Sequence, residues 1–497
     1  MTKRFHMSRR TFLKVSAVGA VVLMGGGLLL RDLFLRDHNP SSTATGVIRG
    51  QRLPIPDLLT GTELDGKHVY DLIMEPGSMA YVSGQQTATW GYNGNILGPT
   101  LLMHKGDEVV INVTNRLGEP TTTHWHGLHL PTIMDGGPHQ RIDDGNTWKA
   151  QYSILNEEAT FWYHPHLMNK TAEHVYHGLA GLILVKDHQS ELALPNQYGT
   201  DDIPLIIQDE IFNADGSFNY PGTHMGVKGD QFLVNGAVTP VFNAPAQFVR
   251  FRLLNGSNAR IYNFGFSDNR QFYQIGTDGG LLERPVPLTR LRLSTGERAE
   301  ILVDFNGEEN SRVRLVSFSS ELDNINPIWN SNSLDNSTID IMTIDVKAAT
   351  ANPTTALPAS LASINRLQES KAARTRTFEL EMGFSGPMKI NGKSMDMNRI
   401  DQTINLNETE IWEVTNRSDL PHPFHVHDIQ FLILTRDGSP PPENEAGWKD
   451  TVLVMPRETV RIITHFSDFA DPVKPYMFHC HILEHEDAGM MGQFVVV

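Results

Sequence analysis

The chain has 497 residues, with 41 basic and 57 acidic side chains and a formal net charge of -16 at pH 7. At roughly 150 residues per domain, this length predicts about three domains. The negative charge argues against a nucleic-acid partner, because binding a phosphate backbone requires a basic surface. A single cysteine, Cys480, excludes an intramolecular disulfide and every metal site that needs two thiolates.

The N-terminal segment has the layout of an export signal. Arg9 and Arg10 precede an uncharged, apolar stretch from Val15 to Leu30, which is the order of regions in a twin-arginine signal. We therefore expect residues 1–45 to engage the twin-arginine export machinery and to direct the folded protein to the periplasm. A small-residue cleavage site is not evident in this segment, so an uncut signal that serves as a membrane anchor is the alternative.

Beyond residue 46 the sequence consists of short alternating runs separated by Gly, Pro, Asn and Asp, which is typical of strands and turns. Three charged and apolar strands end in the same way, at Asn115, Asn255 and Asn416, which are 140 and 161 residues apart. This repeat agrees with the number of domains expected from length. We predict an all-β protein with three β-sandwich domains at 46–187, 188–348 and 374–497, and a linker at 349–373.

Histidines gather in pairs in the first and third of these units. Four short segments that total 24 residues hold ten of the 21 histidines, where chance would place about one. Alternate residues of a strand point to the same face roughly 6.5–7 Å apart, so two imidazoles with this spacing can bind neighbouring ions. If the two units face each other, a cluster of about three ions is held by eight histidines: His124, His126, His164, His166, His425, His427, His479 and His481.

The last histidine pair flanks the single cysteine. If this segment begins on a strand, Cys480 points away from its two neighbours and binds a different ion while remaining covalently next to the cluster. A turn after the strand can bring His485 and Met490 back to the thiolate, and His422 supplies a second imidazole. Two imidazoles, one thiolate and a weak thioether are typical of a blue-copper electron-transfer site. Zinc has no use for the methionine.

These motifs resemble those of the multicopper oxidases, specifically the bacterial three-domain cuprous oxidases of copper tolerance and the wider laccases, over nearly the whole chain. The resemblance implies three cupredoxin-like Greek-key domains, a monomer and four copper ions. It also implies that a type 1 copper takes electrons from a small-molecule or metal-ion reductant and that a three-copper cluster reduces dioxygen to water. The implied ligands are His422, Cys480, His485 and Met490 for type 1 copper, His124 and His425 for type 2, His126, His164 and His481 for one type 3 ion, and His166, His427 and His479 for the other.

The resemblance also implies residues that serve catalysis without binding copper. Reduction of dioxygen to water consumes protons, which acids near the cluster can relay. Asp135 matches the family's aspartate beside the cluster and Glu486 matches its proton-donating glutamate, while Cys480 provides the electron path. The alternative for Asp135 is that it only organises the Gly-Gly-Pro turn in which it lies.

The reductant and two rival functions stay open at this point. Cuprous oxidases of this family carry a methionine-rich insert over the type 1 site, and this chain has no such run. We therefore predict an open type 1 site that accepts phenols or aromatic amines. Cu(I) is the alternative reductant. Residues 175–181 and 206–209 also resemble a periplasmic cell-division scaffold of the same fold, which lacks the copper ligands. A copper store or electron carrier would explain the type 1 set but not the eight histidines.

Overall fold

The computed structural model describes residues 41–188, 190, 192–322, 333–383 and 387–497. Within these ranges the strands form six sheets, and each consecutive third of the chain contributes two of them. The prediction of an all-β fold with three cupredoxin-like domains is therefore confirmed. The twin-arginine motif and its apolar stretch lie outside the described residues. No helix in the described ranges has both the length and the apolar composition needed to cross a membrane.

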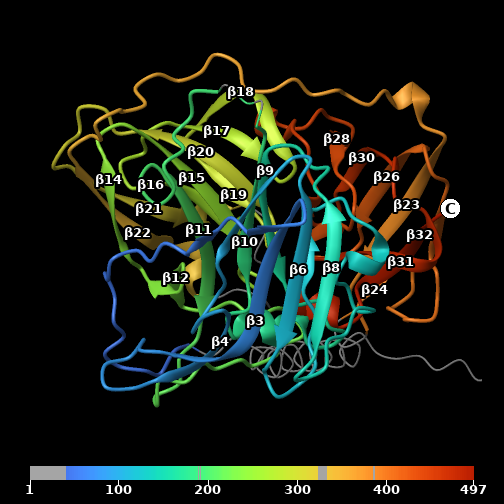
Figure 1. Ribbon diagram of the computed structural model, residues 1–497, viewed down its shortest axis with the longest axis horizontal. Coiled ribbons are helices and arrows are strands. Elements are labelled where there is room, and N and C mark those ends of the chain that lie inside the picture. Colours follow the sequence, from blue (N-terminus) through green and yellow to red (C-terminus); the bar gives the residue numbers. More distant parts are fainter. Residues whose placement is uncertain (1–40, 189, 191, 323–332, 384–386) are drawn as a thin grey trace, which may run out of the picture.

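The first pair of sheets, in blue to green in Figure 1, is built from residues 58–186. Its strands are β1 (Leu58–Leu59), β2 (Thr62–Leu64), β3 (Lys67–Met79), β4 (Thr87–Tyr92), β5 (Thr100–His104), β6 (Glu108–Asn115), β7 (His124–His126), β8 (Thr147–Ser153), β9 (Ala159–His164) and β10 (Gly181–Lys186). One sheet has the order β1-β5-β10-β9-β7, and the other has the order β2-β3-β6-β8 with β4 beside β3.

The second pair, in green to yellow, spans residues 202–347. Its strands are β11 (Asp202–Glu210), β12 (Gln231–Val234), β13 (Ala237–Val238), β14 (Val241–Pro245), β15 (Phe248–Asn255), β16 (Tyr262–Phe266), β17 (Phe272–Thr277), β18 (Gly280–Leu288), β19 (Leu291–Leu293), β20 (Arg298–Asp304), β21 (Arg312–Phe318) and β22 (Thr338–Lys347). Every residue of β11 and β15 is buried, because the outer face of their sheet packs on the first pair through Leu182, Ile206 and Leu254.

The third pair, in orange to red, spans residues 374–496. Its strands are β23 (Arg374–Glu381), β24 (Lys389–Ile390), β25 (Gln402–Ile404), β26 (Thr409–Asn416), β27 (His422–Val426), β28 (Phe431–Arg436), β29 (Thr451–Val454), β30 (Thr459–His465), β31 (Asp471–Cys480) and β32 (Met491–Val496). Residues 348–368, all of them described, form neither helix nor strand and run along the top edge in Figure 1 from the second pair to the third.

The asparagine repeat marks the same local structure three times. Asn115, Asn255 and Asn416 end β6, β15 and β26, and all three side chains are fully buried. In each case the Oδ1 atom accepts the N–H group two residues further on, at 2.8–3.2 Å, and the Nδ2 atom donates to two main-chain carbonyls. Since a buried amide must satisfy all of these groups, the asparagine fixes how the chain leaves each strand.

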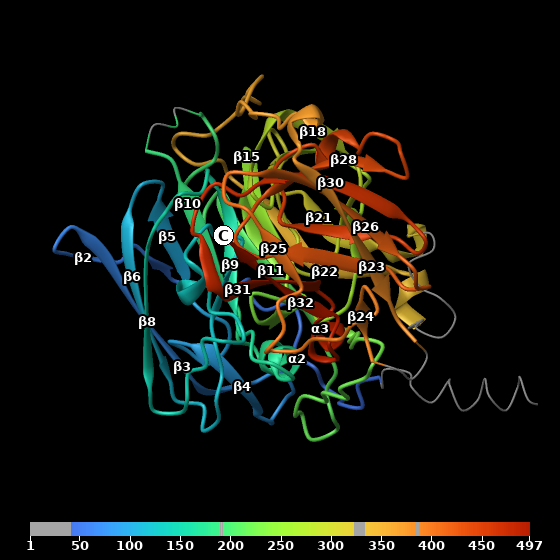
Figure 2. The same cartoon turned by 90° about the vertical axis from the view of Figure 1, so that its right-hand side faces the viewer.

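The histidine pairs lie on short strands whose register sets them against one another. Strand β7 pairs with β9, which places His124 opposite His164, and β27 pairs with β31, which places His425 opposite His479. Two short helices follow these strands, α2 (Thr171–Tyr176) and α3 (Leu483–Asp487), and they lie side by side in Figure 2. The fold thus brings the ends of four strands from the first and third pairs to one interface.

Candidate metal centre

Four groups of buried side chains bring potential metal-binding atoms within 4.8 Å of one another at this interface. Three of the groups contain histidines only and share one pocket, and the fourth contains the cysteine. The groups are His124, His126 and His425; His126, His164 and His481; His166, His427 and His479; and His422, Cys480 and His485. The structure therefore brings together the histidines and the cysteine that the sequence predicts as ligands, with His126 added to the predicted pair of His124 and His425.

Six of the eight histidines keep at least one buried ring nitrogen that has no hydrogen-bond partner in the protein. His124 and His425 each donate from Nδ1 to a main-chain carbonyl, of Asp135 at 2.8 Å and of Asp450 at 2.9 Å, and their Nε2 atoms have no protein partner. His164 is held in the same way by the carbonyl of Pro165 at 2.7 Å. Both ring nitrogens of His481 are buried without a hydrogen bond. Buried polar atoms without partners are rare, and a hydrogen bond at one ring nitrogen is how proteins orient a metal-ligating imidazole.

Burial favours the neutral form of seven of these imidazoles, which is the form that binds a metal. Burial lowers the pKa of His481 to about 3 and that of His427 to about 4. Burial and the neighbouring imidazoles lower the pKa of His126, His164 and His425 further below the usual range. Metal ions bind imidazole in its neutral form, so the arrangement suits several adjacent cations.

The cysteine group is compact and separate from the histidine pocket. The Sγ atom of Cys480 lies 3.4 Å from Nδ1 of His422 and 3.6 Å from Nδ1 of His485, and these two nitrogens are 3.2 Å apart. All three side chains are fully buried. The neighbouring Met490 is also fully buried and joins this group through its main chain, which accepts the N–H of Cys480 at 3.0 Å. One thiolate, two imidazoles and a methionine fit copper better than zinc.

The prediction of an open type 1 site is wrong, because the predicted type 1 ligand His485 is not exposed to solvent. His485 is fully buried, and the main chain of Met225 from the middle unit forms a hydrogen bond with it, with His224 close by. Gly226 in the same segment takes a φ of +90°, and an added Cβ there would lie 3.0 Å from Ile482 beside α3. The segment 223–227 therefore covers the cysteine group. No motif in the sequence indicates this cover, because it comes from a distant unit.

Cys480 connects the two parts of the centre through its own backbone. It ends β31 between His479 and His481, which belong to two different histidine groups. The thiol side chain faces the third core, whereas both histidine neighbours face the pocket. As predicted from the strand alternation, the side chain of Cys480 and those of its two covalent neighbours belong to three different groups of potential metal ligands.

Asp135 bridges two of the histidine groups. It follows the short helical turn Thr132–Met134, and its Oδ2 atom lies 2.8 Å from Nδ1 of His427 while Oδ1 lies 3.4 Å from Nδ1 of His124. Burial alone would raise the pKa of this carboxyl, but His427 and His124 together hold the pKa below its usual range. The side chain thus does more than organise its turn.

Glu486 contacts the same histidine group from the other side. Its two oxygens lie 3.2 Å from Nδ1 of His166 and 3.3 Å from Nδ1 of His479. Burial, with Asp487 next in importance, raises the pKa of Glu486 well above its ordinary value. Every Nδ1 atom of the group formed by His166, His427 and His479 therefore faces a carboxylate.

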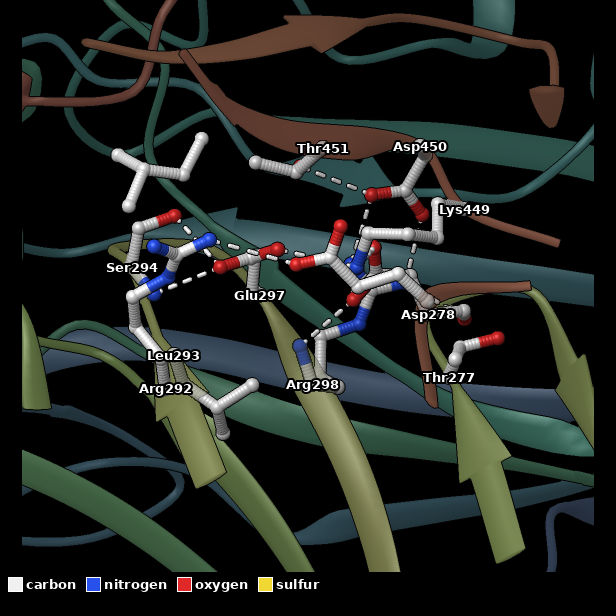
Figure 3. A network of polar contacts seen from close by, with 12 residues as sticks. Thr277, Asp278, Arg292, Leu293, Ser294, Glu297, Arg298, Lys449, Asp450 and Thr451 are labelled. Carbon is white, nitrogen blue, oxygen red and sulfur yellow. Dashed lines mark hydrogen bonds and ion pairs between the residues drawn. The ribbon is translucent and has the colours of Figure 1, made fainter. Parts of the chain in front are cut away.

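Two further residues that the sequence does not single out contact the histidines. Asp450 precedes β29, and its Oδ1 atom lies 3.1 Å from Nε2 of His126 and 3.6 Å from Nδ1 of His425. Arg298 of the middle unit donates to both carboxylate oxygens of Asp450, at 2.8 and 2.6 Å (Figure 3). Only the pairing of β27 with β29 places Asp450 here, so no spacing along the chain could have predicted it.

Other residues of the middle unit also contact the third unit beside the eight histidines. Lys449 lies 2.7 Å from Asp278 and 3.0 Å from Glu297, which are both drawn in Figure 3. Gly296 has a φ of +80°, and a Cβ there would meet the ring of His481 at 2.8 Å. Thr295 donates to the carbonyl of His481 at 2.5 Å. The second unit holds no predicted ligand but packs directly on the ligands of the other two.

Four histidines of the first unit lie outside the motifs and contact other protein groups. His174 is buried between Thr121 and Glu119, at 2.9 and 2.8 Å. His139 contacts Gln493 at 2.5 Å, and His177 contacts the carbonyl of Glu173. His129 lies 3.9 Å from Asp428. None of these four belongs to the groups described above.

The sequence matches known oxidases over most of its length. Two multicopper oxidase family models match residues 74–190 and 357–497. A multicopper oxidase from Staphylococcus haemolyticus is 38% identical over 438 residues, which cover 87% of this chain and 89% of the relative. The cell division protein FtsP of Photorhabdus laumondii is 35% identical, with 99% of this chain and 98% of the relative covered.

Solved structures of multicopper oxidases are also similar to this chain. A bacterial laccase-like multi-copper oxidase, CueO from Ochrobactrum sp., has a TM-score of 0.81 and 37% identity, over 90% of this chain and 100% of the other. The McoA multicopper oxidase of Aquifex aeolicus has a TM-score of 0.82 and 32% identity, with 90% and 100% covered. The buried donor set fits copper, and by sequence and structure the chain belongs to the multicopper oxidase family.

Proposed function

We propose that this chain is a four-copper oxidase that couples one-electron oxidation of a reductant to reduction of dioxygen to water. His422, Cys480, His485 and Met490 would hold the type 1 ion, and the eight paired histidines would hold one type 2 and two type 3 ions in the groups described above. Bound copper supplies the one-electron chemistry and the site at which dioxygen is reduced.

The observation that carries this proposal is the connection through Cys480. A copper store or an electron carrier needs only the cysteine group, and it has no use for a second pocket of eight buried imidazoles one residue away. Here residues 479–481 contribute to three of the four groups in turn. This continuity joins the electron-accepting group to the histidine pocket by covalent bonds.

The two acidic side chains have different roles: Asp135 orients a histidine, and Glu486 delivers protons. Asp135 holds Nδ1 of His427 at 2.8 Å and therefore fixes the ring that presents Nε2 to the pocket. Burial, with Asp487 next in importance, raises the pKa of Glu486 and so favours its protonated form, while its oxygens lie against His166 and His479. An acid that is protonated at working pH is suited to deliver protons during dioxygen reduction.

For the reductant, we favour phenols and aromatic amines. One solved relative is described as a laccase-like oxidase with activity towards lignin model compounds and lignosulfonate. Cu(I) is the second candidate, because Met225, whose main chain contacts His485, carries a thioether of the kind that binds Cu(I). Met225→Leu separates the two: it should slow Cu(I) oxidation and spare oxidation of a phenol if the thioether receives Cu(I).

A non-catalytic scaffold is the rival function, because FtsP proteins are among the relatives. A scaffold gains nothing from burying ten histidines, seven of which keep a ring nitrogen without a hydrogen-bond partner, and such burial costs stability. The retained donor set therefore favours the oxidase. We also propose twin-arginine export to the periplasm and action as a monomer in copper homeostasis or in oxidation of aromatic compounds.

The test is dioxygen uptake by the copper-loaded protein with a phenol and, separately, with Cu(I) as reductant. Uptake with an intense blue absorption band from the thiolate supports the oxidase, and the faster reductant names the substrate class. A fully loaded protein without the band and without uptake would overturn the proposal and leave the scaffold as the better function.

A further inference from the structure

A second group of metal-binding side chains lies outside the copper centre, at one end of the first pair of sheets. His104 ends β5, Asp107 lies in the turn that follows, and His188 follows β10. Their nitrogen and oxygen atoms all lie within 4.8 Å of one another, as in the four groups of the copper centre. A third histidine, His68 at the start of β3, brings its Nε2 atom to 3.9 Å from Oδ2 of Asp107.

Three segments far apart in the sequence are brought together here by sheet pairing. Strand β10 runs parallel to β5 with Lys186 opposite His104, so His188 emerges just beyond the end of β5. Strand β3 runs parallel to β6 with His68 opposite Val109, two residues after Asp107. The turn is itself fixed, because the N–H of His104 donates to Oδ2 of Asp107 at 2.8 Å. The convergence therefore follows from the fold and not from chance contacts of flexible chains.

The separations are close to those of a bound ion. Ligands about 2.1 Å from a tetrahedral ion lie roughly 3.4 Å apart. The Nδ1 atom of His104 lies 3.6 Å from Oδ2 of Asp107, and the rings of His104 and His188 are stacked with centroids 3.9 Å apart. Side-chain rotations alone can complete the site, since His188 is exposed and His68 and His104 are partly exposed.

The protonation state also suits a ligand. Burial, His188 and Lys186 lower the pKa of His104, although Asp107 opposes them. His104 is therefore neutral at pH 7, which is the form that binds a metal. The group offers imidazoles and a carboxylate but no sulfur, so it suits a divalent ion such as Cu²⁺ or Zn²⁺ and not Cu⁺.

The group is remote from the copper centre. His164 and His188 lie at opposite ends of the β9 and β10 pair, in which Tyr163 is opposite Gly181. His164 lies opposite Ala180, eight residues before His188, which corresponds to roughly 26 Å of extended chain. No ligand is shared between the two sites.

We propose that His104, Asp107 and His188, with His68 in reach, form a separate peripheral site for one divalent transition-metal ion, Cu²⁺ in preference to Zn²⁺. This inference does not depend on oxidase activity. A bound ion would tie the ends of β3, β5 and β10 together, and it would count as an ion beyond the four of the copper centre.

The test uses full-length protein loaded with four copper ions and freed of excess metal. Titration with Cu²⁺, followed by calorimetry and by electron paramagnetic resonance, should reveal one additional ion with nitrogen ligands, and the blue absorption should not change. A parallel titration with Zn²⁺ should show weaker binding. His188→Ala and His104→Ala should each lower the affinity for this ion at least about tenfold.

The matched control is His177→Ala, which removes a histidine of the same unit that lies outside the group. This variant should bind the additional ion as wild type does. His188→Ala keeps the test decisive even if His104→Ala folds poorly, because His188 is exposed at a strand end. Wild type that binds no ion beyond four, or a His188→Ala protein that binds it as tightly as wild type, would overturn the proposal.

Discussion

Replacing Arg298 with methionine tests whether the middle unit supports the copper pocket. The guanidinium is fully buried and donates to both oxygens of Asp450 and to the carbonyls of Thr160 and Asp278, at 2.6–3.0 Å. Methionine has a similar length but no charge, so Asp450 would remain buried without its cation. Removing one partner of a buried ion pair costs about 3–5 kcal/mol, and we expect a loss of this size in the free energy of unfolding of the metal-free protein.

The same variant should also lose copper selectively. Asp450 contacts His126 and His425, so its displacement should weaken copper binding in the histidine pocket. The cysteine group does not contact Asp450, and its blue absorption should persist. Arg298→Lys keeps the charge but not the two-pronged contact and should fall between the variant and wild type.

Denaturant unfolding followed by circular dichroism measures the first effect, and copper analysis with visible spectroscopy measures the second. Arg312→Met is the matched control, because Arg312 pairs with Asp345 in the same unit but is exposed. Exposed ion pairs contribute little, so this control should unfold as wild type does. If Arg298→Met costs no more stability than Arg312→Met and keeps the full copper content, the reasoning about the middle unit is refuted.

Three other predictions follow from the centre. Cys480→Ser removes the thiolate and should abolish the blue absorption while the histidine pocket still binds copper; a persistent blue band would contradict the ligand assignment. Glu486→Gln should leave the blue band intact and slow reoxidation by dioxygen about 100-fold, the usual contribution of a general acid, and unchanged kinetics would remove its proton role. The metal-free protein should lose stability as the pH falls below about 6.5. In the folded state the pKa values of His422, His427 and His481 are about 3 to 4, so the unfolded chain binds more protons in this window. These three groups alone give a slope of about 4 kcal/mol per pH unit, which thermal unfolding of the metal-free protein at several pH values can measure. A free energy of unfolding that does not change between about pH 6 and about pH 5 would contradict this prediction.

The ligands could be predicted from the sequence because each ligand motif lies within a few consecutive residues. His-x-His on a strand places two imidazoles on one face, and the structure confirms this placement for His124 and His126 in β7. The repeated asparagines were visible as strand ends, and each makes the same hydrogen bonds. Such features depend on a few consecutive residues and on strand alternation.

What the sequence could not predict depends on contacts between units. Asp450 reaches His126 only through strand pairing, and Arg298 reaches Asp450 from another domain. The cover over His485 comes from residues 223–227, which carry no motif. A pattern along one chain does not specify which distant loop packs on a site, so the open type 1 site was predicted wrongly.

The most direct test of the central claim is the stoichiometry of dioxygen reduction. Copper-loaded protein is fully reduced without oxygen and then mixed with a limiting amount of dioxygen, while the blue absorption, the remaining dioxygen and hydrogen peroxide are followed. The account predicts that one dioxygen reoxidises one protein, that the blue band returns and that no peroxide appears. Peroxide in the solution, or a reduced protein that dioxygen does not reoxidise, would contradict it.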